Sequence, residues 1–414
     1  MKIRRKYLFY ALAFTSAIIA AAVSAIDAKI INDVITDDPW AFGVSCFVVG
    51  TLISLIIILF FSIPVKKKSL GSRVIDPSFR RLRLFKKEEL KYHIIAGFGN
   101  SVLTIGYFFL LSMLRDPSTV LPFSQIAILY LVGIESITEK NIPTLSEIQS
   151  SVIVVFGAIL GSISLTGTIT LESMAIVFLV IGPAWILFSI YQRKLKMLKI
   201  DNRPNDALNI RFWNVVFACI FTIIIVTIYD VLMNSGHLLA GLTASIEHFG
   251  WVALTMGITF FSYVFYIRAL GIGKASVTQA VRASVVLFAI PFSIMLSYFN
   301  IIPPFSTDPV MMLIKIIGTT LVILGIISFA LTLVKAYIFI RVKPGYPIEE
   351  TMEKLWKING VTRVAAVTGP YNLMVKIRTR TLVKGYERIV RKIEEIEAIK
   401  EYRWESVLKE WEKI

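Results

Sequence analysis

The chain has very little cysteine and histidine. It contains two cysteines and three histidines in 414 residues, and Cys46 and Cys219 each lie inside an apolar run. Neither cysteine has another Cys or a His nearby at metal-ligand spacing, so neither a disulfide framework nor a metal site is predicted. Paired carboxylates within an apolar run and Gly-rich phosphate loops are also missing. We therefore expect no enzyme activity, no catalytic residue and no cofactor.

Acidic residues are scarce relative to basic ones. The chain has 28 Asp and Glu against 44 Lys and Arg, for a net charge of +16. Such a charge could indicate a nucleic-acid partner, but the basic residues lie mainly in short segments between apolar runs. There they are better explained as an orientation signal of a membrane protein. We therefore expect no nucleic-acid partner.

Apolar residues are abundant: they make up 56% of the chain, and the mean hydropathy is +0.72. Runs of about twenty apolar residues, the length that spans a bilayer as a helix, recur as far as Val334. The lipid bilayer is thus the first predicted partner. We predict ten spans, at Tyr7–Ile31, Trp40–Ile63, Tyr92–Leu114, Ser118–Ser136, Ser146–Leu165, Leu171–Tyr191, Ile210–Met233, Ile246–Leu270, Ser276–Tyr298 and Val310–Val334.

The basic residues alternate between the two sides of these spans. They precede the first span and fill the segments 66–91 and 193–203, whereas the first opposite segment carries Asp33, Asp37 and Asp38. The positive-inside rule then places both termini in the cytoplasm. The first apolar run resembles a signal peptide but is too long, so we interpret it as a retained helix. The predicted location is the plasma membrane, with multiple passes.

Ten spans divide into two sets of five, and the second set is then inverted relative to the first. A short internal similarity supports this division. Asp116–Gln125 aligns with Gly273–Arg282, which places Gln125 on Arg282. The predicted domains are residues 1–170 and 171–335, two five-helix repeats, followed by 336–414.

Arg282 is the most unusual residue of the membrane part. It lies inside a predicted span, where an arginine costs roughly 2.5–3.5 kcal/mol on insertion scales. It either binds a ligand or extends its long side chain back to the membrane surface. Gln279 shares its helical face at the i,i+3 spacing. Tyr263 could stack on a ligand, although most aromatic residues of membrane helices serve packing or interface anchoring.

The segments around these residues resemble the drug/metabolite transporter superfamily of the ten-helix, EamA-like type. They are Ala269–Ser276 (Ala-Leu-Gly-Ile-Gly-Lys-Ala-Ser), Val277–Arg282, Ser112–Ser118 and Gly133–Glu135. The resemblance implies transport, with export as the expected direction, of a small organic metabolite by alternating access. The substrate-binding residues we expect are Arg282, Gln125, Gln279 and Tyr263. For the two glutamines, a hydrogen bond between helices without a substrate role is the alternative.

The tail beyond Lys335 is charged and alternating, as in a soluble domain. We predict strands beginning at Ala336 and at Val361–Thr368, Asn372–Thr379 and Glu401–Leu408, and helices at Pro347–Ile358 and Thr381–Glu397. The order β-α-β-β-α-β is that of a ferredoxin-like α+β domain. The whole chain is therefore predicted to be a polytopic α-helical membrane protein with this domain at its C-terminal end.

Asn359–Leu373, which contains Gly-Pro-Tyr-Asn-Leu, and Glu405–Glu410 resemble the ligand-binding (RAM) domain of the Lrp/AsnC regulators. The resemblance implies a homodimer formed through this domain and an amino-acid-like effector bound near Gly369, Tyr371 and Asn372. The family commonly has aspartate where this chain has Asn372. A role in dimerisation alone is the alternative. For the whole chain, the alternative to a transporter is a non-transporting membrane sensor.

Overall fold

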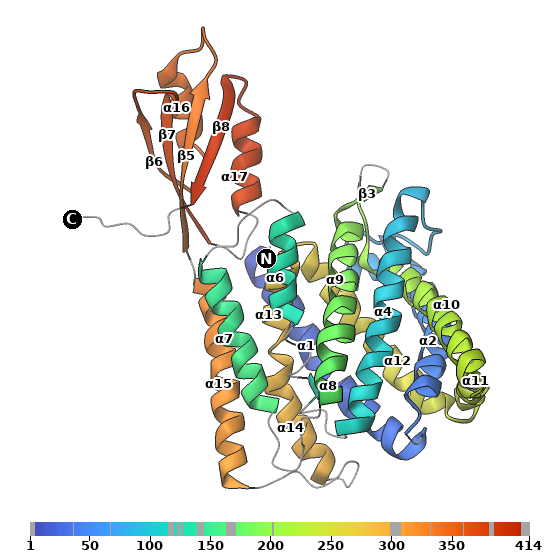
Figure 1. Cartoon of the computed structure of the whole chain (residues 1–414). Helices are drawn as coiled ribbons and strands as arrows, with labels where there is room; N and C mark the ends of the chain where they lie inside the picture. Colours follow the sequence, from blue (N-terminus) through green and yellow to red (C-terminus); the bar gives the residue numbers. More distant parts are fainter. Residues whose placement is uncertain are drawn as a thin grey trace.

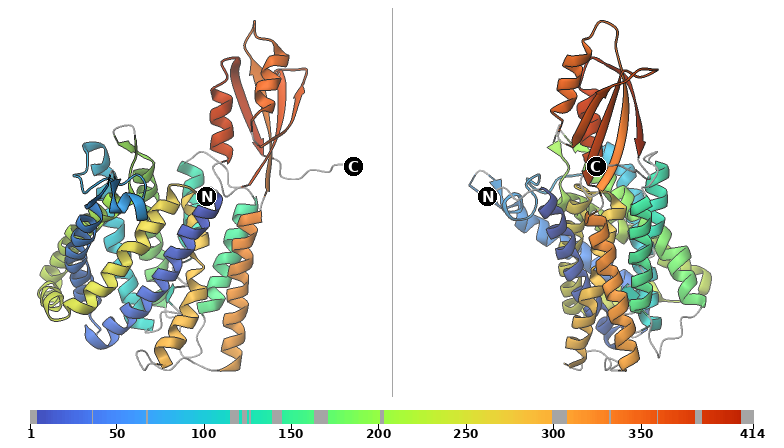
Figure 2. Two further views of the ribbon diagram at one scale, coloured as in Figure 1. Left: turned by 180° about the vertical axis from the view of Figure 1, so that it is seen from behind. Right: turned by 90° about the vertical axis from the view of Figure 1, so that its left-hand side faces the viewer.

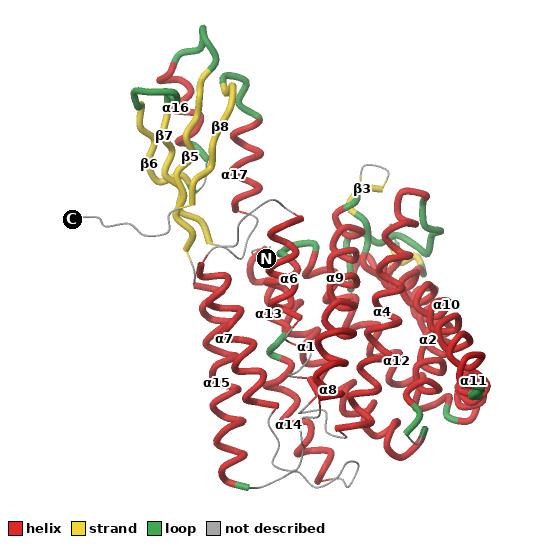
Figure 3. Tube along the Cα trace, in the orientation of Figure 1, coloured by secondary structure: helices red, strands yellow, loops and turns green. Residues whose placement is uncertain are grey.

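The computed structural model describes residues 5–35, 37–66, 68–114, 120–121, 125, 127–138, 145–162, 171–200, 203–298, 308–331, 333–358, 360–380 and 385–406. A helical bundle is followed by a small domain built on a four-stranded sheet, which stands at the end of the bundle that also carries the N-terminus (Figure 1). We call this end of the bundle the domain end. Figure 3 shows that the longer strands all belong to the small domain.

Six helical segments among the described residues are long and apolar enough to cross a membrane. They are α1 (Arg5–Lys29) with its π-helical continuation η1 (Ile30–Val34), α2 (Pro39–Ser62), α4 (Lys87–Leu114), η3 (Ile176–Ile181) with α9 (Gly182–Met197), α10 (Ala207–Met233) and α12 (Phe249–Leu270). This content is compatible with a membrane protein.

The bundle contains further helices among the described residues. They are α3 (Leu70–Val74), α6 (Ala127–Thr138), α7 (Leu145–Ser162), α8 (Leu171–Ala175), α11 (His237–Glu247), α13 (Ala275–Arg282), α14 (Val285–Tyr298) and α15 (Pro309–Leu331). Two small hairpins lie at the domain end: β1 (Pro64–Val65) with β2 (Lys68–Ser69), and β3 (Lys199–Ile200) with β4 (Arg203–Pro204).

Two of the predicted spans are interrupted in the structure. The span predicted to start at Ile246 begins at Phe249, because His248 leaves the helical conformation (φ −110°, ψ 23°) and ends the separate helix α11. The span predicted at Ser276–Tyr298 is divided between α13 and α14. Across this division the N–H groups of Ser284, Val286 and Leu287 bond to carbonyls three residues earlier. The tighter turn interrupts the α-helical hydrogen-bond ladder.

Helices α7 and α15 lie side by side along the bundle (Figure 2). Glycine makes this approach possible. A Cβ atom at Gly157 would lie 2.7 Å from the Gly318 carbonyl oxygen, and one at Gly325 would lie 2.5 Å from the Val154 side chain. Each glycine thus accepts the partner helix at a distance that a larger residue would block.

The C-terminal domain has the predicted order of elements: β5 (Leu333–Val342), α16 (Ile348–Trp356), β6 (Val361–Ala366), β7 (Leu373–Arg380), α17 (Gly385–Glu394) and β8 (Ile399–Ser406). The strands form one antiparallel sheet in the order β6-β7-β5-β8. Ile338, Ile340 and Val375 of the central strands share a core with Leu355 of α16 and Ile393 of α17. This arrangement confirms the predicted ferredoxin-like domain.

One residue separates the bundle from this domain. Helix α15 ends at Leu331 and strand β5 begins at Leu333, which pairs with Arg380 of β7. The predictions that the last span reaches Val334 and that the first strand starts at Ala336 are therefore each wrong by three residues. Leu333 and Val334 are apolar enough for a membrane helix, but they pair with Arg380 and Thr379 of β7 and so belong to strand β5.

Candidate functional site

A partly open cavity of about 120 Å³ lies between the helices of the bundle. Its lining comes from α1, α2, α4, η3, α9, α10, α12, α13 and α14 and from residues 120, 121 and 125, so distant parts of the sequence contribute to it. Its polar lining includes Asp27, Asn100, Gln125, Arg211, Tyr263 and Arg282. The volume can hold several water molecules or one small solute.

Arg282 is the last residue of α13, at the point where the helical ladder is interrupted. Its side chain is 8% exposed, and its Nε donates a hydrogen bond to Ser16 Oγ at 3.2 Å. The guanidinium carbon lies 5.1–5.3 Å from the ring centres of Trp185, Tyr263 and Tyr266. These are cation–π distances. The guanidinium therefore faces the cavity between aromatic rings and does not extend to the surface of the bundle.

Arg211 is a second cavity arginine, which the sequence-based prediction did not include. It is 1% exposed, and its guanidinium carbon lies 4.3 Å from the ring centre of Tyr263. One of its nitrogens donates to Asn214 Oδ1 at 3.2 Å, and that oxygen also accepts from Asn100 at 3.1 Å. Its Nε has no hydrogen-bond partner among the described residues. Tyr263 thus connects two buried guanidinium groups.

The predicted glutamines contact each other. Gln279 Nε2 donates to Gln125 Oε1 at 3.1 Å, and Gln125 Nε2 donates to the Leu121 carbonyl at 2.9 Å. Both side chains are buried, but only Gln125 lines the cavity. Three of the four predicted substrate-binding residues, Arg282, Tyr263 and Gln125, therefore line the cavity. The fourth, Gln279, is hydrogen-bonded to Gln125.

Asp27 was also missed by the sequence-based prediction. It lies on α1, is 5% exposed, and accepts a hydrogen bond from Thr255 Oγ1 at 2.5 Å. The predicted first span ended at Ile31, which placed Asp27 near its end. The helical segment continues through η1 to Val34, so Asp27 lies about two turns inside it. An aspartate within a long apolar segment was the available signal.

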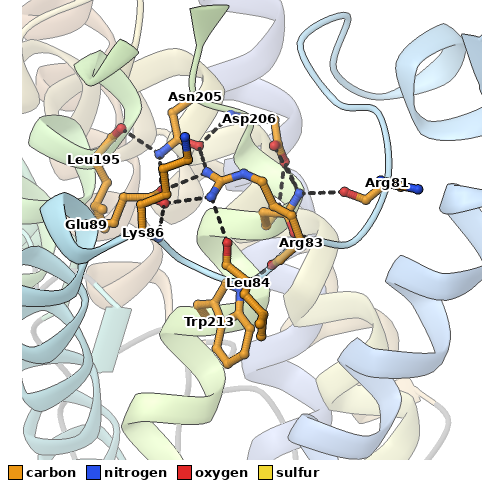
Figure 4. A network of polar contacts seen from close by, with 10 residues as sticks. Arg81, Arg83, Leu84, Lys86, Glu89, Leu195, Asn205, Asp206 and Trp213 are labelled. Carbon is orange, nitrogen blue, oxygen red and sulfur yellow. Dashed lines mark hydrogen bonds and ion pairs between the residues drawn. The ribbon is translucent and has the colours of Figure 1, made fainter. Parts of the chain in front are cut away.

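A network of charged and amide groups fills the domain end of the bundle (Figure 4). Glu89 at the start of α4 accepts two hydrogen bonds from Arg83, at 2.6 and 2.8 Å, and one from Asn205 at 2.7 Å. Arg83 also donates to Asn205 Oδ1 at 2.8 Å, and Trp213 Nε1 donates to the Arg83 carbonyl. These bonds join α4 to the connection between α9 and α10.

A second ion pair completes this network. Lys196 Nζ lies 2.6 Å from Asp76 Oδ2 and donates to the Asn205 carbonyl at 2.6 Å. Asp76 also accepts from the backbone N–H groups of Ala207 and Ser78. Burial favours the neutral form of Asp76, but the charge of Lys196 and these hydrogen bonds outweigh it and lower the Asp76 pKa below 3.8.

The predicted effector residues lie together between β6 and β7. Gly369 has φ +127°, a conformation that favours glycine. Asn372 Oδ1 accepts a hydrogen bond from the Val342 N–H at 2.9 Å, beyond the last β5–β7 residue pair. The ring centre of Tyr371 lies 5.7 Å from the Arg341 guanidinium carbon. Because the Asn372 bond needs only a carbonyl acceptor, asparagine performs the backbone role that an aspartate could perform here. Effector binding at these residues stays a prediction.

Comparisons with known proteins differ between the two parts of the chain. No curated protein matches the sequence. A solved structure titled "Crystal structure of protein" is 13% identical, covers 77% of this chain and 96% of its own, and has a TM-score of 0.47. The helical part gives no match to the EamA-like family. Residues 335–413 match the family model described as the Lrp/AsnC ligand binding domain, so the C-terminal domain belongs to that family.

Proposed function

We propose that the chain is a membrane transporter for a small organic anion, regulated by its C-terminal Lrp/AsnC domain. The cavity is lined by helices from across the bundle and contains two buried guanidinium groups, Arg211 and Arg282. No acidic side chain of the described residues lies within ion-pair distance of either guanidinium.

Buried guanidinium groups without a counter-ion are costly inside a membrane protein and mark functional sites. A carboxylate, phosphate or sulfonate would supply the missing charge, and guanidinium binds such groups with paired hydrogen bonds. Trp185, Tyr263 and Tyr266 hold the Arg282 guanidinium over their faces and leave its edge for the ligand. The proposed substrate therefore carries at least one negative group.

Alternating access is supported by the way the helices pack. Helix α4 packs on α9 and α10, and α12 packs in the corresponding way on α1 and α2. Helices α7 and α15 pair with each other. Such an exchange of partners is expected of two inverted five-helix repeats. The ten-span arrangement, the EamA-like relationship, the cytoplasmic termini and export as the direction all belong to this proposal.

The C-terminal domain is well placed to regulate such a cycle. Only one residue connects α15 to β5, so a movement of the sheet displaces the end of α15. We propose that an amino-acid-like effector binds near Gly369, Tyr371 and Asn372. We further propose that two chains associate through this domain.

Counterflow in proteoliposomes tests the transport function. The full chain is reconstituted, and uptake of radiolabelled carboxylates, sulfonates, organic phosphates and amino acids is measured against the same unlabelled compound inside. We expect Arg282→Gln and Arg211→Gln each to reduce uptake of the transported compound at least about tenfold, the loss of one charged hydrogen bond. Arg73→Gln, at an exposed arginine of α3, is the matched control and should have no effect. Equal uptake by all variants would overturn the assignment of the site.

A non-transporting sensor is the second candidate. It is favoured by the one part of the chain with an identified family, a ligand-binding domain joined directly to α15. It predicts that effectors stabilise the full chain against thermal unfolding while no compound shows counterflow. Counterflow of any compound that depends on Arg282 would exclude it.

A further inference from the structure

The acidic residue Asp27 lines the same cavity as the two arginines but lies far along α1 from the residue that Arg282 contacts. Arg282 bonds to Ser16 of α1, and Asp27 is eleven residues further along the same helix. At 1.5 Å per residue this is a separation of roughly 16 Å. The two charges of an α-amino acid are about 3 Å apart, because only two bonds of backbone dimensions separate the nitrogen from the carboxyl carbon. Such a ligand cannot contact both ends of the cavity at once.

The surroundings of Asp27 provide hydrogen bonding but no positive charge. Thr255 of α12 donates to one carboxyl oxygen. The titratable groups that line the cavity beside it are Cys46 of α2 and Tyr107 of α4, both of which are neutral in ordinary conditions. The nearest cation along α1 is Lys29, which pairs with Asp33. No Lys, Arg or His among the described residues forms an ion pair with Asp27.

A carboxylate buried with one hydrogen bond and no counter-ion is unfavourable in the ionised form. It is stable there when it carries a proton, and the cavity gives water a place beside it from which a proton can arrive. We infer that the Asp27 carboxyl is a second site of the cavity, a proton-binding site whose occupancy is coupled to the anion bound at Arg211 and Arg282. This inference rests on the proposed transport function.

The coupling has a definite sign. An anion at the arginines and an ionised Asp27 repel each other, so each disfavours the other, and protonation of Asp27 removes the repulsion. At roughly 16 Å and an effective dielectric constant of about 20, protonation strengthens the binding of a monoanion about fivefold. The linkage is reciprocal, so the anion also favours the proton. The proton and the anion are therefore carried together, the proton taken from water on one side and released to water on the other.

Methanesulfonate is a suitable probe because it is a small monoanion whose charge does not change between mildly acidic and mildly alkaline solution. Its affinity for the full chain in nanodiscs is measured by the fluorescence of the tryptophans, of which Trp185 lines the cavity. We expect wild type to bind about fivefold more tightly in mildly acidic than in mildly alkaline solution. Asp27→Asn should bind with the tighter affinity throughout. Asp33→Asn, at the exposed acid of the same helical segment, should behave as wild type.

Infrared spectroscopy supplies a readout that needs no ligand. Lowering the pH should produce a protonated-carboxyl stretching band in wild type that Asp27→Asn lacks and Asp33→Asn retains. Absence of this band, or identical pH dependence of binding in wild type and Asp27→Asn, would overturn the inference and leave the anion site intact. If neither Arg282→Gln nor Arg211→Gln changes the affinity for methanesulfonate, the proposed function is overturned instead.

Discussion

The charged residues at the domain end of the bundle are buried or half-buried and form ion pairs, whereas the arginines of the cavity are buried and have no acidic partner among the described residues. Arg83 and Glu89 share two hydrogen bonds, and Lys196 lies against Asp76. In the cavity, Arg211 and Arg282 face aromatic rings and neutral polar groups. The paired charges therefore hold segments together, whereas the unpaired ones leave their charge available to a ligand.

This difference separates stability from function. Breaking a buried pair leaves an uncompensated charge, whereas neutralising a buried charge that has no counter-ion removes a cost that the fold already bears. Substitutions of similar size in the two regions should therefore have opposite effects on stability.

The largest effect on stability should come from Glu89→Gln. The substitution leaves Arg83 with a neutral partner and disturbs the bonds to Asn205, so we expect a loss of about 3 kcal/mol in the free energy of unfolding. Thermal and denaturant unfolding of the full chain in detergent measures it. Lys29→Gln, at the exposed pair with Asp33, is the control and should cost less than about 1 kcal/mol. Equal losses for the two variants would contradict the structural role of the network.

Arg282→Gln should affect transport without lowering stability. We expect its unfolding temperature to equal or exceed that of wild type, because a buried charge without a counter-ion is removed. Its counterflow activity should nevertheless fall at least about tenfold. A destabilisation as large as that of Glu89→Gln would show that Arg282 is a structural residue.

Acid should weaken the network at the domain end of the bundle. The pKa of Asp76 is lower in the folded chain than the ordinary 3.8, so the folded state binds fewer protons. The stability from Asp76 is therefore complete above about pH 3.8 and is lost as the pH falls through the folded pKa. Asp76→Asn should show a smaller loss of stability on acidification than wild type. The free energy of unfolding is measured at a series of pH values. The same pH dependence in Asp76→Asn and wild type would argue against the Lys196–Asp76 pair.

The smallest effect should occur in the C-terminal domain. Asn372→Asp keeps the oxygen that accepts from the Val342 N–H, so unfolding of the full chain should change by less than about 0.5 kcal/mol. Asn372→Ala removes that acceptor and should cost about 1 kcal/mol. If both variants lose the same stability, the bond to Val342 is not the reason why this position needs a carbonyl oxygen.

Local patterns predicted the C-terminal domain well. The alternation of buried Ile338 and Ile340 with half-buried residues and the turn at Gly369 depend on neighbouring residues only, so the order of strands and helices could be predicted. Arg282 was identified in the same way, as a charge within an apolar run. The predicted ends of the elements differed by a few residues, because pairing in the sheet decides where β5 begins.

The partners of the cavity residues could not be predicted from sequence. Arg211 lies 52 residues before Tyr263, and Asp27 lies 228 residues before Thr255, so their contacts depend on how distant helices pack. The interruption between α13 and α14 also has no strong local signal, since Pro291 lies well after it. Only the packed bundle shows that Arg211, Asp27 and Arg282 share one cavity.

Binding of a transported anion by the unpaired arginines of the cavity can be measured by counterflow in proteoliposomes, with wild type, Arg282→Gln and Arg73→Gln compared at equal reconstitution. We expect at least one organic anion whose exchange is retained by Arg73→Gln and reduced about tenfold or more by Arg282→Gln. Exchange that is the same in all three proteins, or that is absent for every anion, would contradict it.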